Sequence, residues 1–225
     1  MSDLPYSTIS VSGADAFEFL QAQLAGDLRK LNDAGLSAWC NPKGRVICLF
    51  RVSNTDDTFE LSLPTELVDT VLKRLTMFRF RAKVDFAIAD ASKDLLGIEG
   101  SYEDWRLRNL QTGIPEILAA QSEEFTPHML NLDLLNAVSV EKGCYPGQEI
   151  VARTHFRGAT KRRLLRFQSL APVIVGDKIS DGERDVGEVL NAIGNELLAV
   201  VPVEKADQPL AIGKNALLHL PLPYL

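Results

Sequence analysis

After Thr160 the residue pattern changes to short β-prone runs separated by turn residues. This change constrains the fold of the chain more than any other feature. Short β-prone runs alternate there with Gly, Asp, Asn and Pro, namely KRRLLRFQSL, GDKIS, RDVGEVLNAI and NELLAVVPVE. Strand-length runs separated by turn residues are typical of a small all-β module that closes on itself. We therefore predict a C-terminal β-barrel module over residues 159–225.

The residues before this module mix strand and helix periodicities, which predicts an α+β body over residues 1–158. Ser12 and Asp15 are spaced as a capping box ahead of a helix. Two β-prone runs flank the turn residues 41–44, which predicts a hairpin, and residues 36–96 are a candidate subdomain. After Pro64, an apolar stripe with a period near 3.6 predicts a helix, and its members are Leu67, Val68, Val71, Leu72, Leu75 and Phe78.

Composition narrows the class of protein. The net charge is -6, and no run approaches the roughly 18 apolar residues that would cross a bilayer. The first residues, MSDLPYSTIS, lack the features of a signal peptide. Three cysteines without a C-x-x-C pair and three scattered histidines argue against a disulfide framework and a metal cage. We expect a cytoplasmic protein with no membrane partner and no metal site.

One stretch, EKGCYPGQEIVARTHFRG at residues 141–158, has the residues of a reactive site. Between Lys142 and Arg166 lie seven Lys or Arg and one acid, Glu149, which favours binding of an anion. Nearby cations lower the pKa of a thiol, so Cys144 is a candidate reactive cysteine with Lys142 beside it. The alternative is that Cys144 is a small buried side chain, as free cysteines usually are.

The neighbouring candidates have simpler interpretations as well. The basic run Lys161–Arg166 is either a contact for an anionic partner such as RNA or a solvated strand face. Cys40 and Cys48 fit strand residues that face the core. The sequence NPKGR at residues 41–45 fits a basic hairpin turn.

The stretch from Lys142 to Leu164 resembles the signature K-G-C-[FY]-x-G-Q-E of the YgfZ family of folate-binding proteins. That family is related to the tetrahydrofolate-dependent T-protein of the glycine cleavage system, and it includes a mitochondrial iron–sulfur assembly factor. The resemblance covers most of the chain and implies a T-protein-like fold. Further segments match family patterns in the same order, namely SVSGADAFEFLQAQLAGDL, CNPKGRV, FRFRAKVDF, GIPEI, FTPHMLNLDLL and LHLPLPYL.

The resemblance also implies a cofactor and a set of site residues. The cofactor would be tetrahydrofolate or another folate derivative, and Cys144 and Lys142 would be the catalytic pair. Between Gly97 and Trp105 the chain is short where longer relatives carry an extra block of strands and helices. Gln111 stands where the family usually has an acid that helps to hold the pterin ring. The implied cofactor-binding residues are Tyr6, Trp105, Gln111, Tyr145, Gln148, Glu149 and Arg153.

Three functions follow from this combination. The resemblance favours a folate-binding accessory protein that supports iron–sulfur cluster assembly or repair, and thereby tRNA modification, with iron–sulfur proteins as clients. A single cysteine cannot by itself hold a cluster, which usually has four cysteine ligands. An aminomethyl transferase would need a positioned acid or base, and nothing in the sequence marks Asp27 or Asp133 for that role. An RNA-binding module using Lys161–Arg166 would show a steep salt dependence.

Overall fold

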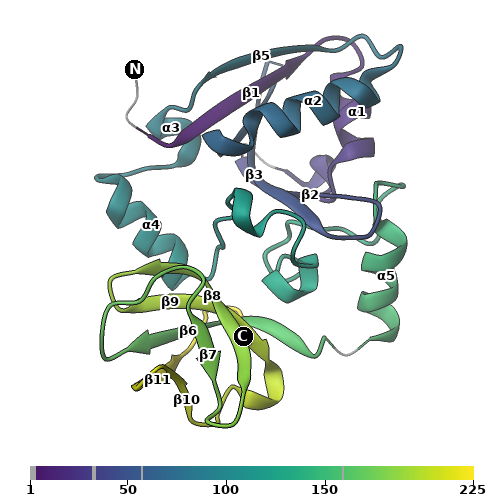
Figure 1. Cartoon of the computed structure of the whole chain (residues 1–225). Coiled ribbons are helices and arrows are strands. Elements are labelled where there is room, and N and C mark those ends of the chain that lie inside the picture. The colour runs from purple at the N-terminus through teal and green to yellow at the C-terminus, as the bar shows by residue number, and fades with distance from the viewer. Residues whose placement is uncertain (1–3, 32–33, 57, 159) are drawn as a thin grey trace. The chain divides into compact units, whose positions relative to one another are not determined.

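The computed structural model describes residues 4–31, 34–56, 58–158 and 160–225, and Figure 1 shows its elements. The chain divides into two compact units, which are described separately. The first consists of residues 1–99, 117–127 and 135–153, and the second of residues 100–116, 128–134 and 154–225. The predicted boundary at 158/159 falls at Ala159, which lies outside the described residues, and it stays a prediction.

The first unit is built on a five-stranded antiparallel sheet with the order β2-β3-β4-β1-β5. Alternation along β1 places Ile9 opposite Leu61 and Val11 opposite Phe59, and all four side chains are buried in one core. The predicted hairpin at residues 41–44 is confirmed as the connection between β2 and β3. The strands are β1 (Tyr6–Ser12), β2 (Ala34–Cys40), β3 (Val46–Thr55), β4 (Thr58–Pro64) and β5 (Asp85–Asp90).

Two helices, α1 (Ala16–Gln23) and α2 (Val68–Arg79), pack on this core. The apolar stripe that predicts α2 is confirmed up to Leu75, which is fully buried, but the Phe78 side chain is exposed. The capping box at Ser12 and Asp15 is wrong. Asp15 makes no side-chain cap for α1, because its carboxylate accepts the backbone N–H of Lys83 at 2.7 Å.

The remaining helical elements are short. The longer two, α4 (Tyr102–Gln111) and α5 (Gln148–Arg157), flank the part of the chain that has few regular elements. The others are α3 (Lys93–Leu96), η1 (Leu28–Lys30), η2 (Thr65–Leu67), η3 (Ala119–Gln121), η4 (Pro127–Leu130) and η5 (Val203–Lys205). In the part of the chain that the structure describes, no helix is long and apolar enough to span a membrane.

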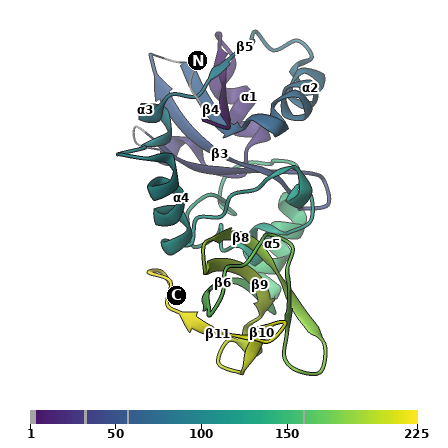
Figure 2. The same ribbon diagram turned by 60° about the vertical axis from the view of Figure 1, so that its left-hand side comes forward.

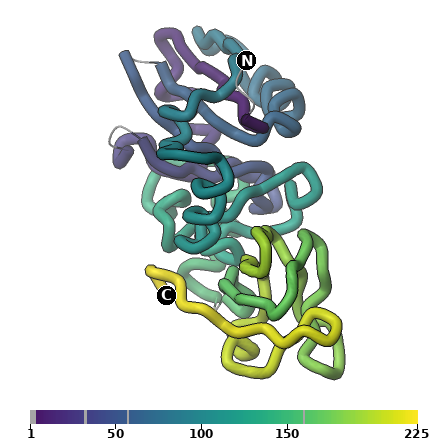
Figure 3. The backbone as a smooth tube through the Cα atoms, turned by 90° about the vertical axis from the view of Figure 1, so that its left-hand side faces the viewer, coloured from purple at the N-terminus to yellow at the C-terminus, as the bar shows by residue number. Residues whose placement is uncertain are grey.

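The second unit confirms the predicted β-barrel, in which six strands close in the order β10-β11-β6-β9-β8-β7. Figure 2 shows β6, β8, β9, β10 and β11 grouped in this unit. Alternate residues point inward, as Leu197, Ala199 and Val201 do in β9. After β11 the end of the chain extends from the barrel (Figure 3), and the Tyr224 hydroxyl donates to the Gly113 carbonyl at 2.8 Å. The strands are β6 (Arg162–Ser169), β7 (Lys178–Ser180), β8 (Asp185–Ile193), β9 (Glu196–Pro202), β10 (Leu210–Ile212) and β11 (Asn215–Leu220).

Three arginine side chains of β6 form hydrogen bonds or ion pairs with other groups of the second unit. The Arg163 guanidinium makes two hydrogen bonds to the Asp133 carboxylate, at 3.0 and 2.9 Å. Arg162 donates to two strand carbonyls, at 2.8 and 2.9 Å, and Arg166 pairs with Glu196. Three of the cations that the sequence offers to an anionic partner therefore stabilise the barrel and its surroundings.

Candidate functional site

The hairpin turn between β2 and β3 is held rigidly by polar contacts. Asn41 Oδ1 accepts the N–H groups of Lys43 and Arg45, at 2.9 and 3.0 Å. Asn41 Nδ2 donates to Glu123 at 2.6 Å, and Arg74 pairs with the same carboxylate. The Asn41 hydrogen bond and the Arg74 guanidinium lower the pKa of Glu123, so this carboxylate stays charged as the anchor of the turn.

The loop that carries the candidate cysteine packs on this turn through two glycines. A Cβ atom on Gly147 would lie 2.5 Å from the Asn41 carbonyl oxygen and 2.7 Å from Gly44 Cα. Gly147 has φ +81° and Gly44 has φ +69°, conformations that favour glycine at both positions. The motif at residues 142–149 and the turn at residues 41–45 therefore meet backbone to backbone.

Lys142 ties the start of this loop to another part of the first unit. Its side chain is buried, and Nζ donates to the carbonyls of Leu24 at 2.7 Å and Gly26 at 2.9 Å. The same ammonium group lies 5.4 Å from the centre of the Tyr145 ring, a cation–π arrangement. The ammonium group thus fixes the backbone, and the predicted role of Lys142 beside a thiolate stays a prediction.

Tyr145 and Gln148 complete the packing of the loop. The Tyr145 ring is buried, and burial raises the pKa of its phenol. Gln148 opens helix α5, and its Nε2 donates back to the Lys142 carbonyl at 3.0 Å. Lys142, Tyr145 and Gln148 hold the loop between them, so Cys144 lies on a backbone that is fixed at both ends.

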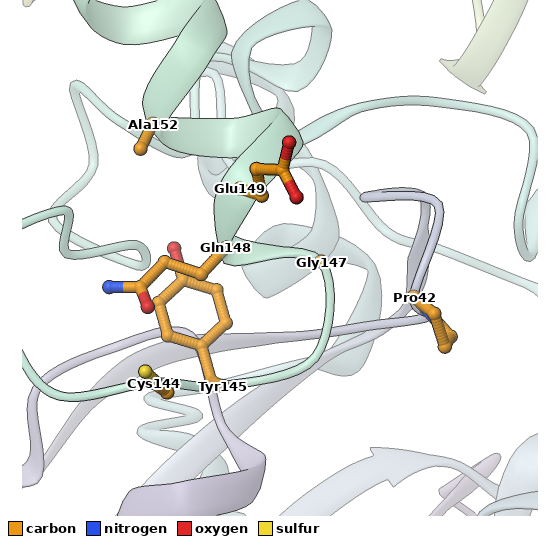
Figure 4. Close-up of a pocket in the computed structure, with 7 residues that line it drawn as sticks. All are labelled: Pro42, Cys144, Tyr145, Gly147, Gln148, Glu149 and Ala152. Atoms are coloured by element: carbon orange, nitrogen blue, oxygen red, sulfur yellow. The ribbon is translucent and has the colours of Figure 1, made fainter.

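Cys144 opens onto a surface pocket of about 420 Å³. Figure 4 shows its thiol, the Tyr145 ring and the Gln148 amide grouped below the first turn of α5, with Pro42 across from them on the hairpin turn. Six of the seven lining residues belong to the loop and to α5. The lining consists of Pro42, Cys144, Tyr145, Gly147, Gln148, Glu149 and Ala152.

The three cysteines differ sharply in exposure. All three lie in the described part of the chain, and only Cys144 is exposed. Cys144 is therefore accessible, as a reactive cysteine must be, and it is not the buried side chain of the alternative interpretation. Cys40 and Cys48 are buried in adjacent strands, as expected. Burial raises the pKa of Cys40 to about 12 and also raises that of Cys48, so both stay protonated at neutral pH.

The structure brings some of the predicted site residues together. Cys144, Tyr145, Gln148 and Glu149 line one pocket. Arg153 lies one turn further along α5, where it forms an exposed ion pair with Glu149 at 2.7 Å.

The other predicted folate contacts are not among the residues that line this pocket, and their roles stay predictions. Tyr6 is buried in β1 of the first unit. Trp105 and Gln111 belong to α4 of the second unit, where Trp105 stacks on Tyr102 with ring centres 5.6 Å apart. Gln111 Nε2 donates to Glu196 at 3.1 Å.

The predicted site residues omitted three lining residues and the support of the turn. Pro42, Gly147 and Ala152 line the pocket. Glu123 and Arg74 fix the turn from elsewhere in the chain. The sequence signal for the turn was the CNPKGRV segment, which matches a family pattern. The same segment also fits an ordinary hairpin turn, so it did not mark a site. Among the described residues, no group of three or more His, Cys, Asp or Glu could hold a metal ion.

The fold defines the class of protein. It is the fold of the aminomethyltransferase T of the glycine cleavage system from Bartonella henselae, with a TM-score of 0.73 over 98% of this chain and 84% of that one. Sequence identity to that structure is 14%, so the match concerns the fold. The prediction of an α+β, T-protein-like fold with a β-barrel module is confirmed. No protein-family model matches the chain.

Sequence relatives give the particular group within this class. The tRNA-modifying protein YgfZ of Klebsiella pneumoniae is 27% identical over 297 aligned positions, which cover 97% of this chain and 90% of that protein. The protein of the same name from Escherichia coli O127:H6 is 34% identical, over 65% of this chain and 50% of its own length. An uncharacterised Haemophilus influenzae protein is 29% identical, over 72% and 71%. The chain is a homologue of the YgfZ proteins.

Proposed function

We propose that this protein is a folate-binding accessory factor that supports iron–sulfur cluster assembly or repair, and thereby tRNA modification, through the thiol of Cys144. The observation that carries the proposal is the exposure of this one cysteine on a fixed loop above a pocket. A thiol must be accessible to react, and the two buried cysteines are not. The name of the relatives, tRNA-modifying protein YgfZ, supports the choice of process.

The pocket has groups that fit a folate. The Tyr145 ring, the Gln148 amide and the Glu149 carboxylate offer an aromatic edge, a hydrogen-bonding amide and an acceptor to a flat heterocycle with ring N–H groups. Gln148 Nε2 is engaged with Lys142, so its Oε1 would be the group offered to a ligand. A bound folate would supply a one-carbon carrier beside the thiol.

A lone accessible thiol suits transient contact with a client better than stable cluster binding. An iron–sulfur cluster usually takes four cysteine ligands, and the other two cysteines of this chain are buried. Cys144 would therefore act on a cluster, or on a thiol, that the client protein holds. The aminomethyl transferase alternative predicts turnover of methylene-tetrahydrofolate with an aminomethyl donor, whereas the accessory role predicts none.

Replacement of each cysteine by serine tests the proposal. Cys144→Ser should abolish rescue of iron–sulfur enzyme activity in cells that lack the protein, while the free energy of unfolding stays nearly unchanged because the site is exposed. Cys48→Ser is the matched control, and it should lower the free energy of unfolding by about 1–3 kcal/mol because a hydroxyl is buried. It should still rescue activity wherever the protein folds.

Alkylation of the folded protein adds a chemical readout. Iodoacetamide followed by peptide mass spectrometry should label Cys144 first, before Cys40 and Cys48. Full rescue by Cys144→Ser would refute the proposal, as would a folded protein in which Cys144 resists labelling while a buried cysteine reacts.

A further inference from the structure

The turn that follows helix α2 contains a residue in a conformation that its side chain disfavours. The Ala82 N–H donates to the Arg79 carbonyl at 2.8 Å and closes a four-residue turn. Phe80, its first central residue, has φ 45° and ψ -109°, the geometry of a type II′ turn in which glycine is normal at this position. A bulky residue with positive φ is a marked outlier, and such strain clusters at functional sites.

The ring of Phe80 also projects into solvent. It is 88% exposed, so the strained backbone is not compensated by burial of the side chain. Met77 and Phe78, in the last turn of α2, are 67% and 44% exposed. Three large apolar side chains within four residues thus lie outside the core that the rest of α2 helps to form. Clustered exposed apolar groups of this kind mark interaction surfaces.

The exposure of Phe80 is built into a fixed turn. Arg79 Nη1 donates to the Val84 carbonyl at 3.2 Å, and the Lys83 N–H donates to Asp15 at 2.7 Å. A Cβ atom on Gly13 would lie 2.3 Å from the Lys83 carbonyl oxygen, so the segment also packs closely on the loop after β1. These contacts therefore fix the backbone that carries Phe80, which is not part of a loose loop.

Positive charge surrounds these apolar side chains. Between Asp69 and Asp85 the chain has five Lys or Arg and no acid, although its net charge is -6. Arg74 pairs with Glu123 and Arg79 bonds a carbonyl. Arg81 and Lys83 are exposed, and their side chains form no ion pair with any residue that the structure describes. We name the group Met77, Phe78, Phe80, Arg81 and Lys83 the α2-turn surface.

We propose that the α2-turn surface binds single-stranded RNA. Exposed aromatic rings that alternate with cations are an arrangement on which unpaired bases can stack while phosphates are neutralised. The inference deepens the proposed function and rests on it only for the choice of RNA as the polyanion.

This location differs from the one that the sequence favours. Arg162, Arg163 and Arg166 of the basic run are bound to carbonyls and carboxylates of the second unit. An arginine that is already paired contributes little to a phosphate contact unless its pair breaks. The α2-turn surface offers unpaired cations and stacking rings together, so it is the better RNA contact of the two.

Binding of a short fluorescent oligouridylate, followed by anisotropy at several salt concentrations, tests the proposal. Phe80→Ala should weaken binding at least about fivefold, because stacking on one aromatic side chain contributes roughly 1–3 kcal/mol per base. Arg81→Glu should weaken binding and lower the slope of log Kd against log salt by about 0.7 for each phosphate that is no longer neutralised. The matched controls are Ile174→Ala, an exposed apolar residue of the second unit, and Lys214→Glu, an exposed cation there. Neither should change the affinity.

A glycine variant separates loss of the ring from loss of the fold. Phe80→Gly relieves the positive φ, so it should fold at least as stably as Phe80→Ala and still lose RNA affinity. Unchanged affinity in both Phe80 variants would overturn the proposal. Preference for a polyglutamate chain or duplex RNA over the oligouridylate would overturn it too, and polyglutamate binding would identify an acidic protein partner. Cys144→Ser should retain RNA binding even where it fails to rescue activity, so the two proposals can fail separately.

Discussion

At the scale of single residues, Lys142 has a structural role that its place in the sequence does not indicate. The sequence places it two positions from Cys144, where a cation would stabilise a thiolate. The structure instead buries its ammonium group against the carbonyls of Leu24 and Gly26. The loop that carries Cys144 is therefore tied to the segment after α1 by a buried charge, and the geometry of the site depends on this tie.

This burial has a consequence for stability that can be measured. Desolvation lowers the pKa of Lys142 from 10.5 to about 8, against the opposing attraction of Asp27. Between these two values the unfolded chain binds more protons than the folded one, so the contribution of Lys142 to stability rises with pH. The free energy of unfolding of the native protein minus that of Lys142→Met should increase from pH 8 to 10.5, by at most about 1.4 kcal/mol per pH unit.

Urea denaturation across this pH range measures the difference. Lys30→Met is the matched control, because Lys30 is an exposed lysine that pairs with Glu141 in the same unit. The rise with pH that involves Lys142 is the part that appears for Lys142→Met and not for Lys30→Met. A flat profile for Lys142→Met would show that Lys142 has its ordinary pKa and that its ammonium group is not desolvated.

At the scale of elements, the contact between two loops places Pro42 beside the pocket of Cys144. The turn after β2 and the loop before α5 meet at Gly44 and Gly147, and neither position has room for a side chain. The pocket beside Cys144 has Pro42 from the turn and the remaining lining from the loop and α5. The side of the pocket that Pro42 forms therefore depends on the contact between these two backbones.

Gly147→Ala should break this contact. The added Cβ would meet Asn41 O at 2.5 Å and the backbone has φ +81°, so we expect a loss of about 2–4 kcal/mol in the free energy of unfolding. The rate of Cys144 alkylation should change as the loop moves. Gly143→Ala, in the same loop, has no atom within 4 Å of its added Cβ and no positive φ. This control should stay within about 0.5 kcal/mol of the native protein, and equal effects of the two variants would contradict the role of the glycine contact.

Local patterns predicted the elements better than they predicted the site. The barrel, the hairpin and most of α2 follow from alternation, turn residues and helical period, which are encoded within a few neighbouring residues. The contacts of Lys142 with Leu24 and Gly26, and of Gly147 with Gly44, join distant segments, and no periodicity encodes them. Phe78 continued the apolar stripe of α2 but is exposed, because the helix ends beside it and the chain turns at Phe80.

For the whole molecule, the two tryptophans report on the two units. Trp39 lies in β2 of the first unit, and Trp105 lies in α4 of the second. If folate contacts Trp105, as the family resemblance implies, tetrahydrofolate should quench the fluorescence, Trp105→Phe should remove most of the change, and Trp39→Phe should keep it. If folate binds only in the pocket beside Cys144, which belongs to the first unit, Trp39→Phe should remove the change and Trp105→Phe should keep it. No quenching after inner-filter correction would argue against folate binding.

The meeting of Gly44 with Gly147 also sets the order in which the molecule can be completed during synthesis. The hairpin has all its residues once the chain has passed β3, but its glycine partner is made about 100 residues later. At typical translation rates of about 5–20 residues per second, the interval is roughly 5–20 s. During that interval Gly44 has no glycine partner, and for most of it Cys144 has not yet been made. A nascent chain that stalls before Gly147 would lack the pocket, because Gly147 and the α5 residues that line it have not been made.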